Sequence, residues 1–137
     1  MKASELRLNN YYQLKGSVLG GGVCRITTIQ DFEKIYGLMY SNSVSPIPLT
    51  EERLINIGFS DYSSHCNYKE FCIKGKKPSE HIVVRFGLQK TYFTIFNHSE
   101  CDFTEMQYLT QLEYVHQLQN LYFALTGVEL ELSSNVA

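Results

Sequence analysis

The histidines and cysteines in the second half of the chain are the residues best suited to chemistry. His65 and Cys66 are adjacent, Cys72 follows, and His98 precedes Cys101 by three positions. Imidazole and thiolate groups are common Zn²⁺ ligands, so these five residues are the candidate metal ligands. Their spacing matches no common zinc module, and adjacent ligands chelate one ion awkwardly. The pattern therefore favours ordinary cysteines and loop histidines, and we predict no bound metal and no cofactor.

Covalent catalysis finds little support in the sequence. A cysteine nucleophile needs a nearby histidine or a helix N-terminus to stabilise its thiolate, and no cysteine begins a predicted helix. The glycines of Gly20–Gly22 lack the Lys-Ser/Thr that completes a phosphate-binding loop. Glu51 and Glu52 are explained as acidic residues in the first turn of a helix. We predict no catalytic residue and a protein that is not an enzyme; a His/Cys-dependent enzyme is the least supported alternative.

A more informative pattern lies near the C-terminus. Six apolar and aromatic residues of Tyr114–Thr126 fall within an arc of about 120° on a helical wheel: Tyr114, Val115, Leu118, Leu121, Tyr122 and Leu125. Gly127 follows them as a helix-ending residue. No charged residue occurs between Glu113 and Glu129, although a solvated helix face normally carries Glu and Lys. The side of this helix away from its apolar stripe carries His116, Gln119, Asn120 and Phe123.

Two interpretations fit this uncharged helix. In the first, the N-terminal strands of the same chain cover its second side, and its amide side chains bond to backbone groups. In the second, the face is a contact surface for self-association or for a ligand, because amide and aromatic groups suit hydrogen-bonded, stacked recognition. The sequence alone leaves both interpretations open.

The composition limits the class of protein. The chain has 137 residues, 44% of them hydrophobic, and ten tyrosines and eight phenylalanines. The net charge of −2 and the pI near 6.1 argue against extended nonspecific nucleic-acid binding, because such proteins usually carry a basic stripe. No apolar signal segment follows Met1, and no stretch is apolar enough to span a membrane. We expect a cytoplasmic protein with no membrane partner.

The N-terminal part of the chain is predicted to be rich in strands. Alternating residues and turn signals predict strands over 11–14, 23–30 and 35–40, with Asp31–Lys34 as a turn. The prolines of Ser41–Pro48 mark a connector. We expect residues 1–49 to form a small, partly open SH3-like β-barrel.

The remaining residues are predicted to form a second α+β part. Thr50 and Gly58 suit the two ends of a helix over about 50–57, and a second helix is expected over about 113–126. Strands are predicted over 68–74, 81–86, 92–97 and 103–109. The expected fold class is α+β, in which residues 50–132 form an antiparallel sheet packed on the C-terminal helix and residues 133–137 form a tail.

Three segments together resemble a known family. The segments are Pro46–Phe59 (PIPLTEERLINIGF), Tyr114–Gly127 (YVHQLQNLYFALTG) and the opening Glu5–Tyr11 (ELRLNNY), in which Asn9 stands where family members often have Gly. They resemble a family of small uncharacterised proteins encoded by phages, prophages and mobile elements of Bacteroides-type gut bacteria. The resemblance implies an accessory protein in the cytoplasm of a bacterial host cell, and it brings no established activity.

The leading functional hypothesis is a noncatalytic phage or mobile-element binding protein of the anti-defence type. It would act on a host protein or sequester a small nucleotide signal, and it could form a homo-oligomer. Its binding surface would combine the uncharged helix face with tyrosines at Tyr11, Tyr12 and Tyr40. The alternative is a nucleic-acid-binding module in the SH3-like part, where the same tyrosines would stack on bases beside Arg7, Lys15, Arg25 and Lys34.

Overall fold

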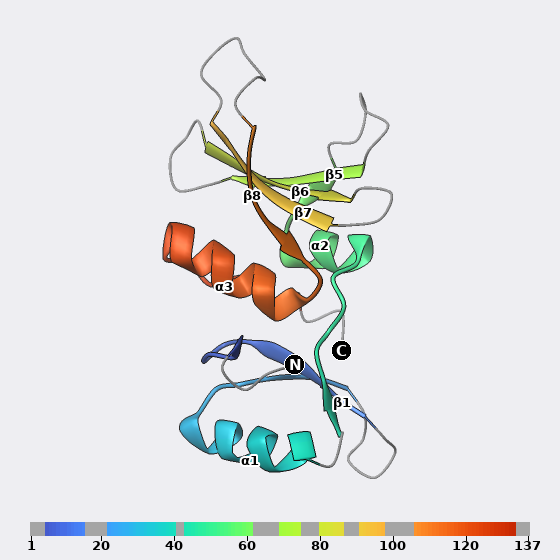
Figure 1. The fold of residues 1–137 in the computed structure, drawn as a ribbon, viewed down its shortest axis with the longest axis vertical. Helices are drawn as coiled ribbons and strands as arrows, with labels where there is room; N and C mark the ends of the chain where they lie inside the picture. Colours follow the sequence, from blue (N-terminus) through green and yellow to red (C-terminus); the bar gives the residue numbers. More distant parts are fainter. Residues whose placement is uncertain are drawn as a thin grey trace. The chain divides into compact units, whose positions relative to one another are not determined.

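The fold is described from a computed structural model, which places residues 5–15, 22–40, 43–61, 69–74, 80–86, 91–97 and 106–133. Within these ranges the chain forms three helices and eight strands, so the predicted α+β class is confirmed (Figure 1). None of these helices has the length and apolar character needed to cross a lipid bilayer. The elements are β1 (Tyr11–Leu14), β2 (Gly22–Arg25), α1 (Ile29–Tyr40), β3 (Val44–Ser45), α2 (Glu51–Ile57), β4 (Ser60–Asp61), β5 (Lys69–Lys74), β6 (Glu80–Phe86), β7 (Thr91–Asn97), β8 (Met106–Leu112) and α3 (Val115–Thr126).

The described residues form two compact units. Unit 1 contains the chain up to Pro48 together with Tyr114–Leu130, and unit 2 contains Leu49–Glu113 and Glu131–Ser133. The boundary after Pro48 lies next to the predicted end of the N-terminal part at residue 49. The grouping differs from the predicted division in one respect, because α3 belongs to unit 1 and not to the part that carries the larger sheet.

Unit 1 is built on a small antiparallel sheet with the strand order β2-β1-β3. Figure 1 shows α1 on one side of this sheet and α3 on the other. Tyr12, Ile26 and Ile35 form the buried centre of the layer between the sheet and α1. The described strands end at the edges β2 and β3 and do not close on themselves, so the predicted SH3-like barrel is not formed by them.

Helix α1 corrects the sequence prediction of a turn over Asp31–Lys34 followed by a strand over 35–40. The backbone N–H of Asp31 donates to Thr28 Oγ1 at 3.2 Å, and the Asp31 carboxylate accepts from the Thr28 N–H at 2.8 Å. This reciprocal pair is a capping box, and it starts a helix at Ile29. The N–H groups of Thr27 and Thr28 hold the pKa of Asp31 at about 2, because they stabilise its ionised form.

Unit 2 is a five-stranded antiparallel meander with the strand order β4-β5-β6-β7-β8. The predicted helix over about 50–57 is confirmed as α2, with Thr50 Oγ1 accepting from the Arg53 N–H at 3.3 Å. Gly58 ends this helix at φ 112°, a conformation that favours glycine. The buried side chains of unit 2 come from the helix, the strands and their connections, and they include Leu54, Ile57, Phe59, Phe71, Val84 and Leu112.

The predicted C-terminal helix is also confirmed. Helix α3 begins after Tyr114, whose backbone N–H donates to Gln117 Oε1 at 3.1 Å. It ends at Gly127, which has φ 73° and donates its N–H to Phe123 O at 2.8 Å. Both ends of α3 are therefore closed by local hydrogen bonds, of which the sequence predicted the end at Gly127.

Candidate functional site

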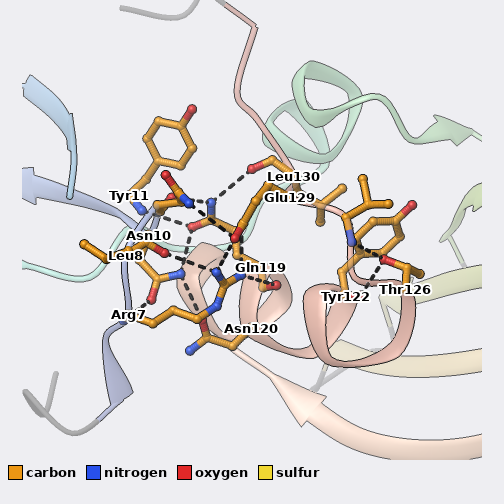
Figure 2. A network of polar contacts seen from close by, with 12 residues as sticks. Arg7, Leu8, Asn10, Tyr11, Gln119, Asn120, Tyr122, Thr126, Glu129 and Leu130 are labelled. Carbon is orange, nitrogen blue, oxygen red and sulfur yellow. Dashed lines mark hydrogen bonds and ion pairs between the residues drawn. The ribbon is translucent and has the colours of Figure 1, made fainter. Parts of the chain in front are cut away.

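The uncharged face of α3 is covered within unit 1 by the N-terminal segment of the same chain. Gln119 is fully buried, and its amide is satisfied by backbone groups. Its Oε1 accepts from the Tyr11 N–H at 3.0 Å, and its Nε2 donates to Asn9 O at 3.0 Å and to Leu130 O at 3.1 Å (Figure 2). These bonds use both amide protons, so Gln119 is a structural cross-link between the helix and the strand.

Two asparagines form further hydrogen bonds between α3 and the N-terminal segment that covers it. Asn10 Nδ2 donates to Asn120 Oδ1 at 2.9 Å, and Asn120 Nδ2 donates to Glu5 O at 2.7 Å. The Arg7 N–H in turn donates to Asn10 Oδ1 at 2.8 Å (Figure 2). The first interpretation of the uncharged helix therefore describes this structure, because the amides of α3 bond to groups of their own chain.

Arg7 closes the outer side of this network. Its guanidinium forms an ion pair with Glu129, with Nη2 2.9 Å from Oε2, and Nη2 also donates to Gln119 O at 3.0 Å. The same group lies over the ring of Phe123 at 4.4 Å from the ring centre, in cation–π geometry. The hydrogen bonds from Arg7 lower the pKa of Glu129. Arg7 is thus engaged in contacts within unit 1, whereas the nucleic-acid hypothesis places it beside the base-stacking tyrosines.

His116 is fully buried at the same interface. Its ring stacks on that of Tyr114 with 5.8 Å between the ring centres, and its Nε2 lies 3.6 Å from Glu5 Oε2. Burial lowers the pKa of His116, while Glu5 acts in the opposite direction. His116 and Gln119 are therefore core residues and not the partner-facing residues predicted from the sequence; of the four predicted on this face, Phe123 keeps the most exposure, at 39%.

The predicted tyrosine surface is also not assembled as expected. Tyr12 is buried in the core of unit 1, and burial next to Cys24 raises its pKa to about 12. Tyr11 is half-buried, with the Arg25 guanidinium 5.6 Å from its ring centre. Tyr40 is the last residue of α1, and its side chain lies outside the described part of the structure.

The candidate metal ligands are mostly outside the described residues. His65, Cys66, His98 and Cys101 all fall in ranges that the structure does not describe. Cys72 lies in β5 and is half-buried. Among the placed residues, no three His, Cys, Asp or Glu side chains are arranged to hold a metal ion.

An apolar hollow on α1 is the feature that the sequence analysis missed. It has a volume of about 360 Å³ and is lined by Leu6, Phe32, Glu33, Ile35 and Tyr36. Ile35 is buried, and Leu6 and Phe32 pack against the core of unit 1, so packed side chains form the base of the hollow. Tyr36 in this lining is 56% exposed, and Ile29, one helical turn before Phe32 and Glu33, is 75% exposed. We name these six residues, from Leu6 to Tyr36, the α1 surface.

The helical wheel explains why this surface exists. With 100° per residue, the apolar and aromatic residues of Ile29–Tyr40 spread over about 200°, whereas a helix that packs on one side needs an apolar arc of about 100°. Ile35 and Met39 occupy the part of the arc that faces the sheet core. Ile29 and Tyr36 occupy the surplus part, which the chain leaves exposed. Recognising the Thr28–Asp31 capping box would have shown this surplus in the sequence.

Comparisons with protein-family models, with curated proteins and with solved structures give no significant match to this chain. The α1 surface is the described feature that combines a hollow with exposed apolar side chains. The function proposed below is therefore built on its geometry.

Proposed function

We propose that this chain is a noncatalytic binding protein that recognises a partner protein through the α1 surface. The observation that carries the proposal is the apolar hollow, whose lining includes the exposed Tyr36, together with the exposed Ile29 one helical turn away. Contiguous exposed apolar surface on a small protein commonly marks an interaction site, since exposing it to water costs free energy. A hollow of this size accommodates one or two apolar side chains from a partner.

A protein is a better fit than a nucleotide signal for this site. Phosphate groups are bound by cationic side chains and by backbone N–H groups at helix N-termini. The lining of the hollow contains neither Lys nor Arg, and its one charged side chain is the carboxylate of Glu33, which repels phosphate. The lining also contains no His, Cys or Ser, which supports a binding role over a catalytic one.

The resemblance to phage and mobile-element proteins extends the proposal. It favours a cytoplasmic accessory protein that binds a protein of its bacterial host. An anti-defence role agrees with that setting by analogy alone.

Nucleic-acid binding is the second candidate, and the observation in its favour is the Arg25–Tyr11 pair. It would require Arg25, Lys15 and Lys34 to act without Arg7 and Tyr12, which are engaged inside unit 1. Binding of single-stranded DNA with a steep dependence on salt would favour it. Binding that is absent or insensitive to salt would remove it.

A matched pair of substitutions tests the leading proposal. Ile29→Glu places a charge on the α1 surface, and Ile55→Glu places the same charge on α2, where Ile55 is 55% exposed. Both variants and the wild-type chain are immobilised and incubated with a lysate of Bacteroides cells, and the retained proteins are quantified by mass spectrometry. The expected result is a protein retained by the wild type and by Ile55→Glu and depleted at least about tenfold by Ile29→Glu. Equal retention on all three chains would refute the role of α1.

A further inference from the structure

The α1 surface includes one charged side chain, Glu33, and its charge limits which partners can cover the surface. Glu33 is exposed and is the only charged residue among the five that line the hollow. Lys34 is the next residue, but consecutive residues on a helix point about 100° apart and do not face each other. A partner that covers the hollow with apolar groups alone would desolvate the Glu33 carboxylate without compensation, which is costly.

On the basis of the proposed function, we propose that the partner is a helical segment with apolar side chains on one face and a Lys or Arg beside them. The apolar side chains would fill the hollow, and the cation would pair with Glu33. The interaction would keep the carboxylate paired when water is excluded, and it would select against acidic segments.

The helical form of the partner follows from the spacing of the α1 surface. Ile29, Phe32 and Tyr36 are separated by three and four positions, so they form one apolar stripe along the helix, roughly 10 Å long. A stripe of this kind packs against the apolar stripe of a second helix. An extended segment would instead need unpaired backbone groups to bond with, and the backbone of a helix interior is already paired.

A second copy of this chain is a poorer occupant. A two-fold contact that packs the apolar stripe of α1 on itself brings Glu33 of one copy close to Glu33 of the other, because Glu33 lies near the middle of Ile29–Tyr36. Like charges that meet at an interface while losing water disfavour association. The homo-oligomer that was considered from the sequence is therefore not expected through this surface.

A displayed peptide library provides the test. The probe is a library of random peptides of about 16 residues, long enough for four helical turns. It is selected in parallel on the wild-type chain, on Ile29→Glu, on the control Ile55→Glu and on Glu33→Lys. Peptides that bind the wild type and Ile55→Glu but not Ile29→Glu are counted as dependent on the α1 surface, and thermal melting confirms that each variant is folded.

The proposal expects these peptides to show apolar residues at helical spacing, with Lys or Arg enriched at least about fivefold over Asp and Glu beside them. Selection on Glu33→Lys should reverse that preference toward Asp and Glu. Dependent peptides with no charge preference, or with the same preference on Glu33→Lys, would overturn this inference and leave the proposed function standing. Absence of any peptide that depends on Ile29 would overturn both.

Discussion

Helices α3 and α1 both have unusual sequences, but they differ in whether the chain itself covers the unusual face. Helix α3 has no charge between Glu113 and Glu129, a pattern that fits either a contact surface or cover by the same chain, and its amide face bonds to the chain's own N-terminal segment. Helix α1 carries ordinary charges at Glu33 and Lys34, yet it leaves a wide apolar face exposed. A helix face without charge therefore indicates that the same chain or a partner covers it. An apolar arc wider than the face that the helix buries in its own unit indicates that a partner is needed.

The largest expected effect separates the two sides of α1. Ile35→Ala should destabilise the protein by about 3 kcal/mol, because Ile35 is fully packed and its removal leaves a cavity. Ile29→Ala should change the free energy of unfolding by less than about 0.5 kcal/mol, since Ile29 is largely exposed. Urea unfolding measures both values. Equal losses at the two positions would mean that Ile29 is packed and that the α1 surface is not exposed.

The second-largest effect is expected at Gln119, which joins α3 to the N-terminal segment that covers it. Gln119→Ala should lower the free energy of unfolding by about 2–3 kcal/mol, because it leaves the Tyr11 N–H and two backbone carbonyls without their buried partner. Gln30→Ala on the exposed side of α1 is the matched control and should cost less than about 0.5 kcal/mol. A Gln119 variant as stable as the Gln30 variant would place the amide face of α3 in water and restore it as a binding surface.

A smaller effect is expected at Arg7, on the outer side of the contacts between the N-terminal segment and α3. Arg7→Lys should cost about 1 kcal/mol, because an ammonium group cannot reproduce the two-point contact with Glu129 or the planar stacking on Phe123. Since Arg7 lowers the folded-state pKa of Glu129, its contribution is present above the unfolded pKa and is lost as the pH falls through the folded pKa. Urea unfolding at pH 7 and at pH 3 should therefore show a smaller difference between the two proteins at pH 3, while the contacts of Arg7 with Phe123 and with Gln119 O persist at both pH values. A constant difference at both pH values would argue against this ion pair.

The smallest expected effect concerns His116. Burial lowers its folded-state pKa below the ordinary 6.5, so the unfolded chain binds a proton that the folded chain resists. Proton binding by His116 in the unfolded chain therefore lowers the stability of the folded protein. This loss is absent above pH 6.5 and grows as the pH falls from 6.5 toward the folded pKa. Thermal melting between pH 7.5 and pH 5 should show a larger loss for the wild type than for His116→Phe, which cannot titrate. Parallel curves for the two proteins would place His116 in contact with water.

Local signals in the sequence predicted much of the fold. Thr50 and Gly58 bound α2 as expected, and Gly127 ends α3. These signals act over a few residues, so they can be found without knowing the tertiary structure. The start of α1 is harder to predict, because Thr28 ends an alternating stretch and Asp31 is a common turn residue, although together they cap a helix.

The candidate site was less predictable, because it depends on contacts between distant segments. Whether Gln119 faces a partner or Asn9 is decided by the folding of residues more than a hundred positions apart, which no local pattern records. The exposure of Tyr36 likewise follows from which part of α1 the sheet occupies. The sequence could show that α3 needed a second cover, and only the structure could say that the chain supplies it.

The separation between Gln119 and Asn9 has a consequence for how the protein is made. The hydrogen bond between them joins residues 110 positions apart, so unit 1 cannot be completed until the C-terminal helix has left the ribosome. At ordinary translation rates the N-terminal strands wait on the order of ten seconds for α3, with the face of Asn10 and Tyr11 uncovered. The continuous segment Leu49–Glu113 of unit 2 is free to fold during that interval. A truncation before Tyr114 would therefore be expected to spare the meander and to leave the N-terminal sheet prone to aggregate.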